Sequence, residues 1–248
     1  MDAITFKYSS DFITIYNLAE YARYITGIND ITVEFVEEKA YKSPCVELGN
    51  KIIYLPKIDY INNLDSDIFR IIKTYLCHEC AHLMYQEEKY KYTIPKKWKK
   101  HFWFLGALVN TIVDLRIENL IGIKHKELRD DFKFLIEYHW KELYIHYAND
   151  NDMGYGRYGD FSFDMSGSLY WLLQKRYRRA NLISPYGCGT SFPFKTIEGM
   201  EQLFENELVP VLDIFINSEK SSWETAVKML NILKKNYPEI FETSPEKY

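Results

Sequence analysis

The segment Cys77–His82 contains the pattern His-Glu-x-x-His at His78, Glu79 and His82, inside a stretch with helical periodicity. Successive side chains of an α-helix are turned by roughly 100°, so these three fall within an arc of about 100° on one face. Two neutral imidazoles on one face can hold a zinc ion, and the glutamate between them can accept a proton from a water molecule that the ion activates. The spacing therefore predicts metal-dependent hydrolysis, with His78 and His82 as ligands and Glu79 as the general base.

The same segment contains Cys77-x-x-Cys80, a spacing that is also typical of redox pairs and thiolate metal sites. On the helical wheel both thiols lie roughly 150° from the histidine face, so they cannot bind the same ion. We expect both cysteines to pack as small apolar residues.

A second polar pattern lies about thirty residues downstream, where Asn110, Asp114 and Glu118 follow one another at intervals of four among Val, Ile and Leu. Residues at this interval share one helix face. A tetrahedral zinc site with two histidines needs a third protein ligand and leaves its fourth position for water. We predict Asp114 as this ligand, with Glu118 as the alternative ligand or as a group that holds a histidine ring nitrogen.

Asn110 is expected to align a ligand or a substrate carbonyl. The other interpretation of this stripe remains open: its three polar residues could simply pair with Arg116 or with basic neighbours.

Helix lengths place a condition on the choice of Asp114. If a helix ending at Tyr92 were joined by a tight hairpin to a helix beginning at Pro95, His82 would lie about 15 Å from the turn and Asp114 about 28 Å. The two side chains could not then share an ion. The connection must therefore be bent or splayed, with a break near Gly106 as one candidate, or the choice of ligand is wrong.

Before the motif helix, the pattern predicts a helix over 10–25, a strand over 31–36 and a hairpin. The hairpin has arms at 45–48 and 51–55 around Gly49-Asn50, and we expect Pro56 to end it. A strand edge beside such a helix could pair with an extended peptide substrate, although an ordinary small sheet gives the same pattern. After the motif, helices are expected over 95–121, 125–147, 168–180, 196–217 and 221–236, the last opened by the capping box Ser221-x-x-Glu224.

The glycine-rich segment 150–160 has the clearest loop composition in the chain. Loops of this kind often cover active sites, and Tyr155, Arg157 and Tyr158 are candidates for donating a hydrogen bond to a developing oxyanion.

The composition, 47% hydrophobic and 27% charged, is ordinary for a globular protein. The net charge of −4 argues against a general nucleic-acid-binding surface, and the basic runs 96–100 and 175–179 are short enough to be solvated helix faces. No apolar run could span a bilayer, and the first residues lack the organisation of a signal peptide. We therefore expect a cytoplasmic protein that does not act on membranes or nucleic acids.

With both polar patterns in view, the chain resembles zincin metallopeptidases, and more narrowly those of phages and bacteria that accompany a von Willebrand A domain. The resemblance covers about residues 45–120. It implies one bound zinc ion, a protein or peptide substrate, and a partner protein with a von Willebrand A domain or an ATPase. Val113 departs from these relatives, which often have an acidic residue there. The matching residues are His78, Glu79, His82, Asn110, Asp114, Arg116, Ile117 and Glu118.

The resulting expectation is an α+β, mostly helical, zincin-like fold: an N-terminal helix, a small sheet, the motif helix and a helical C-terminal half. Residues 1–150 would form the metallopeptidase core and 151–248 a helical region packed on it, within one continuous domain. Two other functions remain open. One is a catalytically inactive zincin-fold protein that acts as a binding or structural partner in a phage or von Willebrand A and AAA-ATPase system. The other is a metal-dependent hydrolase with a non-peptide substrate.

Overall fold

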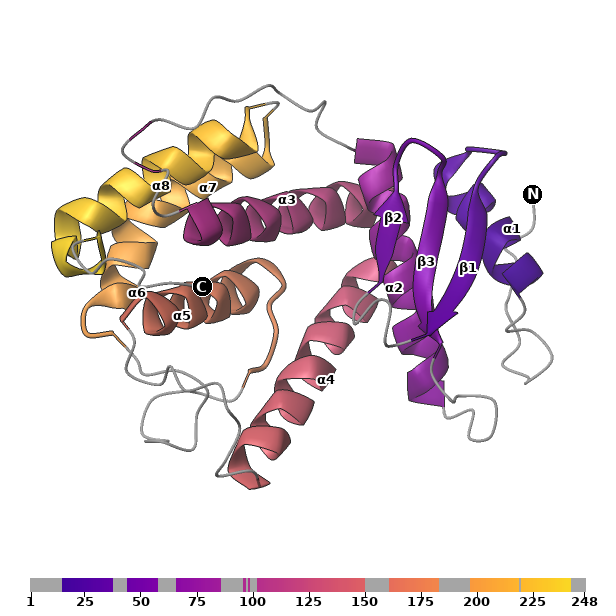
Figure 1. Cartoon of the computed structure of the whole chain (residues 1–248), viewed down its shortest axis with the longest axis horizontal. Helices are drawn as coiled ribbons and strands as arrows, with labels where there is room; N and C mark the ends of the chain where they lie inside the picture. The colour runs from indigo at the N-terminus through magenta and orange to yellow at the C-terminus, as the bar shows by residue number, and fades with distance from the viewer. Residues whose placement is uncertain are drawn as a thin grey trace. The chain divides into compact units, whose positions relative to one another are not determined.

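The computed structural model is mostly helical and contains one small sheet, which confirms the predicted α+β class (Figure 1). None of the helices in the described part of the chain combines the length and the apolar character that crossing a membrane requires. The structure describes residues 15–37, 44–57, 66–85, 96, 98, 102–149, 161–182, 197–218 and 220–241.

The chain divides into two compact units, each made of two separate segments. The first unit comprises Met1–Gln86 and Leu120–Asp131, and the second comprises Glu87–Asn119 and Phe132–Tyr248. The expected metallopeptidase core over 1–150, with a helical region over 151–248 packed on it, stays a prediction.

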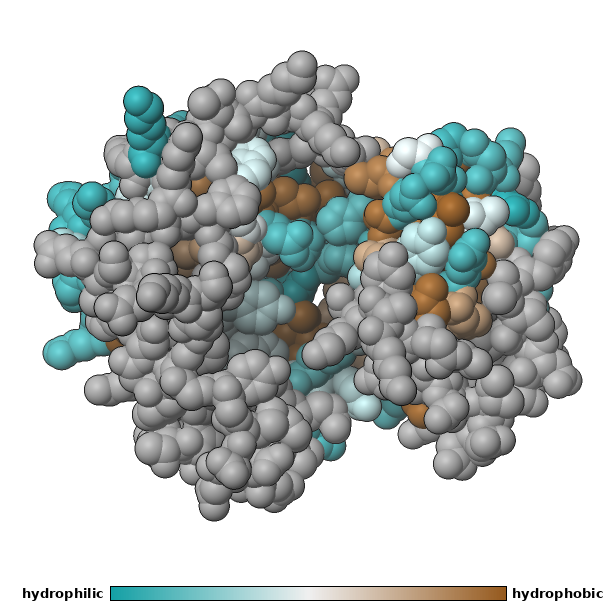
Figure 2. Space-filling view, viewed as in Figure 1, coloured by the Kyte–Doolittle hydropathy of each residue, from teal (hydrophilic) through white to brown (hydrophobic). Residues whose placement is uncertain are grey.

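The first unit contains helix α1 (Ile15–Thr26) and a sheet in the order β1-β3-β2 (Figure 1). Strand β1 (Thr32–Glu37) runs parallel to β3 (Ile52–Lys57), and β2 (Cys45–Glu47) is antiparallel to β3. The predicted hairpin is thus confirmed. Space-filling representation shows polar and apolar residues interspersed over these strands on the face in view (Figure 2).

Two details of the hairpin differ from the prediction. The turn spans four residues, 48–51, and ends with Lys51 in the left-handed region at φ 55°. Pro56 does not end β3 but lies inside it, opposite Val36 of β1. Because β2 pairs only with Ile52–Tyr54, Pro56 lies beyond the antiparallel pairing, where its missing N–H disrupts no bond to β2.

Helix α2 (Ser66–Tyr85) carries the His-Glu-x-x-His motif and packs against α1, β2 and β3. Its buried residues Ile72, Leu76 and Cys80 recur every four positions, which gives the helix its apolar face.

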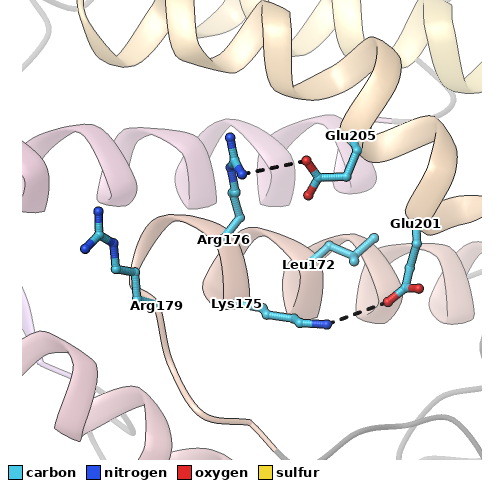
Figure 3. Close-up of a pocket in the computed structure, with 6 residues that line it drawn as sticks. All are labelled: Leu172, Lys175, Arg176, Arg179, Glu201 and Glu205. Atoms are coloured by element: carbon cyan, nitrogen blue, oxygen red, sulfur yellow. Dashed lines mark ion pairs between the residues drawn. The ribbon is translucent and has the colours of Figure 1, made fainter.

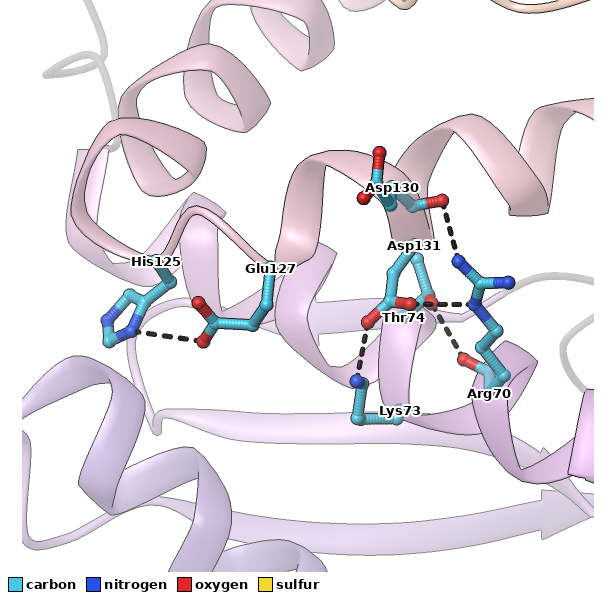
Figure 4. A network of polar contacts seen from close by, with 7 residues as sticks. All are labelled: Arg70, Lys73, Thr74, His125, Glu127, Asp130 and Asp131. Carbon is cyan, nitrogen blue, oxygen red and sulfur yellow. Dashed lines mark hydrogen bonds and ion pairs between the residues drawn. The ribbon is translucent and has the colours of Figure 1, made fainter. Parts of the chain in front are cut away.

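A polar network attaches the start of helix α4 (Leu128–Asn149) to α2 within the first unit (Figure 4). The buried carboxylate of Asp131 accepts hydrogen bonds from Arg70 Nε at 2.7 Å and forms an ion pair with Lys73 Nζ at 2.5 Å. The backbone carbonyl of Asp130 accepts a further bond from Arg70.

Helix α3 (Phe102–Lys124) is continuous, so the break considered near Gly106 is wrong. A glycine inside a helix costs only about 1 kcal/mol relative to alanine, which long apolar flanks readily offset. The hairpin considered with ends at Tyr92 and Pro95 lies outside the described residues, and the described helices end at Tyr85 and begin at Phe102.

The second unit is organised around an apolar core that α3 shares with the C-terminal helices (Figure 1). These are α5 (Phe161–Tyr177), α6 (Met200–Leu203), α7 (Val209–Ile216) and α8 (Ser222–Asn236). Members of the core include Leu105, Leu108, Ile112, Leu169, Leu172, Phe204, Leu212, Phe215, Met229 and Leu233.

The helix predicted over 196–217 contains a π-helical turn, Phe204–Leu208, between α6 and α7. Pro210 follows this turn, and proline cannot donate the usual backbone hydrogen bond to the preceding turn. The capping box of α8 is confirmed, since the Ser221 side chain accepts a hydrogen bond from the backbone N–H of Glu224.

Candidate metal centre

The paired histidines of α2 bring one nitrogen each to the same place. Their Nε2 atoms lie 3.3 Å apart, and the rings are nearly perpendicular, with centroids separated by 4.9 Å. In a tetrahedral site with zinc–nitrogen bonds of about 2.0–2.1 Å, two ligand nitrogens are about 3.3 Å apart. The geometry of His78 and His82 therefore fits two ligands of one zinc ion.

Glu79 lies between the histidines in sequence and is only 4% exposed. The Cys45 thiol of the edge strand β2 lies within the electrostatic influence of Glu79. Burial raises the pKa of this thiol, and the negative charge of Glu79 raises it further. Glu79 follows His78 directly on the same helix, so we keep it as the candidate for exchanging protons with a water molecule at that site.

Asp114 of α3 supplies a third potential ligand. Asp114 belongs to the second unit, whereas His78 and His82 belong to the first, and all three side chains are half-buried. Asp114 as the third ligand stays a prediction. The amide of Asn110 donates a hydrogen bond to Asp114 Oδ2 at 3.1 Å, so Asn110 orients the carboxylate of this candidate ligand.

Glu118, the alternative ligand, is bound by an arginine within the second unit. Its two carboxylate oxygens accept hydrogen bonds from Nε and Nη2 of Arg178, each at 2.5 Å. Burial alone would lower the pKa of Arg178, but Glu118, Tyr170 and Asp114 together hold that pKa above its usual value. Arg178 thus stays charged and binds Glu118 in a bidentate pair.

Tyr170 of α5 lies in the same electrostatic environment. Burial raises the pKa of its hydroxyl, and the carboxylates of Asp114 and Glu118 raise it further, while Arg178 opposes them. Its ring stacks on that of Trp140, with centroids 6.1 Å apart.

The sequence analysis missed Arg178 and Tyr170. Arg178 belongs to the basic run 175–179, which was expected to be solvated, yet its side chain is only 9% exposed. The polar stripe of Asn110, Asp114 and Glu118 on α3 was the only sequence signal for a buried Arg178, since a carboxylate among apolar residues requires a cation nearby.

The two cysteines of the motif helix are fully buried free thiols, as predicted. Burial raises the pKa of Cys77 to about 12, although Lys73 and a hydrogen bond with Tyr21 oppose the shift. Burial raises the pKa of Cys80 as well, so neither thiol forms a thiolate ligand at neutral pH. The predicted oxyanion donors Tyr155, Arg157 and Tyr158 lie outside the described residues.

A cavity of about 510 Å³ opens in the second unit beside α5, α6 and the π-helical turn (Figure 3). Lys175 and Arg176 form ion pairs across it with Glu201 and Glu205, at 3.8 Å in each case. Leu172 and Arg179 complete its lining, so none of the predicted ligands contributes to it.

No protein-family model, curated protein or solved structure matches this chain. What the centre can do must therefore be inferred from its own residues.

Proposed function

We propose that this protein is a zinc-dependent metallopeptidase with a zincin-like fold, in which His78, His82 and Asp114 hold one zinc ion. The observation that carries the proposal is the geometry of His78 and His82, whose Nε2 atoms lie 3.3 Å apart, together with the burial of Glu79 on the same helix. Two imidazoles and one carboxylate form a donor set that zinc accepts in catalytic sites, where a fourth position stays open.

Zinc bound there would activate a water molecule and polarise the carbonyl of the scissile bond. Glu79 accepts the proton of the attacking water and then delivers it to the leaving amine. Its burial supports this role, because exclusion of bulk water limits the leakage of a transferred proton.

Strand β2 supports a peptide as the substrate. It pairs on one side only within the described sheet, and it packs against α2. An extended peptide that adds to this edge would run beside the motif helix, with backbone hydrogen bonds that do not depend on its sequence. A partner protein with a von Willebrand A domain or an ATPase is part of the same proposal, as the means of delivering such a substrate.

The test compares zinc content and casein cleavage in the wild type and in the Glu79→Gln variant. Because Glu79 is not a ligand, the variant should retain its zinc while cleavage falls by about 10²–10⁴-fold. His82→Ala should lose both. Asp67→Asn, an exposed carboxylate in the first turn of α2, is the matched control and should change neither.

Unchanged turnover in Glu79→Gln would reject this mechanism. Retained zinc without cleavage of casein by the wild type would favour the binding-protein alternative.

A further inference from the structure

The bidentate pair between Arg178 and Glu118 raises the question of what Glu118 would do without it. Glu118 lies one helical turn after Asp114 on α3, and residues at this spacing share a face. Both carboxylates act electrostatically on the same two side chains, Arg178 and Tyr170. Asp114 and Glu118 are therefore neighbouring candidates for one cation, and Glu118 is the one that Arg178 binds in a bidentate pair.

Arg178 is well suited to hold Glu118 away from a metal ion. Its Nε and Nη2 donate to the two oxygens of Glu118, and its Nη1 donates to the side chain of Gln174. The side chains of Arg178 and Glu118 are 9% and 7% exposed, so water competes weakly for these bonds. Bidentate guanidinium–carboxylate pairs combine strong bonds with a fixed orientation.

The number of ligands decides what a zinc site can do. Two histidines and one carboxylate leave a position for water, whereas a second carboxylate would complete a closed, structural type of site. We infer that Arg178 is a positioning residue that withdraws Glu118 from the metal and so keeps the fourth position open. This inference rests on the proposed zinc site, and it explains why a helix face with two carboxylates supplies only one ligand.

The experiment replaces zinc with Co²⁺, whose visible absorption reports the number and type of its ligands, and adds azide as a probe of the open position. In the wild type, azide should change the Co²⁺ spectrum. In Arg178→Met, the released Glu118 should bind the ion, so Co²⁺ affinity should rise and the response to azide should be lost.

The double variant Arg178→Met/Glu118→Gln removes the competing carboxylate. It should restore the wild-type Co²⁺ affinity and spectrum and the response to azide. Arg179→Met is the matched control, because this neighbouring arginine is exposed and lines the separate cavity, and it should behave as the wild type does.

A merely structural role for Arg178 predicts different results. Arg178→Met would then bind Co²⁺ about 10–100-fold more weakly, as is typical when support for a ligand is lost, and the double variant would not recover. Either result overturns the inference. If Arg178→Met does not fold, the double variant, which contains no unpaired charge, decides alone: the wild-type affinity and azide response support the inference, and their loss rejects it.

Failure of the proposed function gives a separate signature. In that case the wild type would bind no Co²⁺, or His82→Ala would bind it equally well.

Discussion

At the scale of single residues, the two thiols of α2 illustrate how burial controls chemistry. Cys77 and Cys80 are fully buried, and burial raises the pKa of both, to about 12 for Cys77. Because the thiolate is the reactive form, a thiol reagent at pH 8 should modify the half-buried Cys45 before Cys77 and Cys80. Cys77 and Cys80 should react only as fast as the protein unfolds. Mass spectrometry of each cysteine against time checks this order.

Denatured protein is the control, since all cysteines should then react at similar rates. Modification of Cys77 in the folded protein at the rate of Cys45 would contradict the prediction.

The sequence identified residues whose roles depend on local spacing and missed those whose roles depend on distant partners. His78, Glu79 and His82 can be placed on one face from their spacing alone. Lys175, Arg176 and Arg179 of the basic run 175–179 are exposed, and only Glu118, 60 residues away, determines that the Arg178 side chain is buried. No periodicity within the run contains that information.

At the scale of elements, the attachment of α4 to α2 depends on one carboxylate. Replacing Asp131 by Ala removes the acceptor shared by Arg70 and Lys73 and leaves two partly buried cations without it. We expect a loss of about 1–3 kcal/mol in the free energy of unfolding. Urea unfolding of both proteins, with m-values compared, measures the difference.

Asp130→Ala is the matched control, because that residue binds Arg70 through its backbone carbonyl, which alanine retains. Its effect should stay within about 0.5 kcal/mol. Equal effects of the two substitutions would show that the ion pairs contribute nothing.

Most helices and the hairpin could be predicted because apolar periodicity, capping residues and turn residues act locally. The boundaries were less accurate, and the π-helical turn before Pro210 was not expected. Proline removes one backbone hydrogen bond of the helix. Packing in the surrounding core then determines whether the helix ends there or continues through a wider, π-helical turn. Here Phe204, Leu208 and Leu212 are all buried in that core, and the helix continues.

At the scale of the whole molecule, the second unit needs segments from both halves of the chain. Leu105, Leu108 and Ile112 of α3 belong to the same core as Leu169 of α5 and Phe215 of α7. A fragment of residues 1–150 lacks α5, α6, α7 and α8 and should expose the apolar face of α3. It should bind the dye ANS and melt without cooperativity.

Co-expression of residues 151–248 should restore a cooperative transition, and the full chain is the reference. A fragment 1–150 that melts cooperatively without binding ANS would support the division expected at residue 150. The two units are defined by contacts between residues far apart in the sequence, which composition does not report.

The interleaved order of the two units has a consequence for the history of the gene. The chain leaves the first unit after Gln86, returns at Leu120 within α3 and leaves again after Asp131. Every single recombination crossover within the chain therefore divides at least one unit, and one between Phe102 and Lys124 also cuts a continuous helix. The two halves of this architecture cannot be shuffled separately as modules, so they must be inherited together.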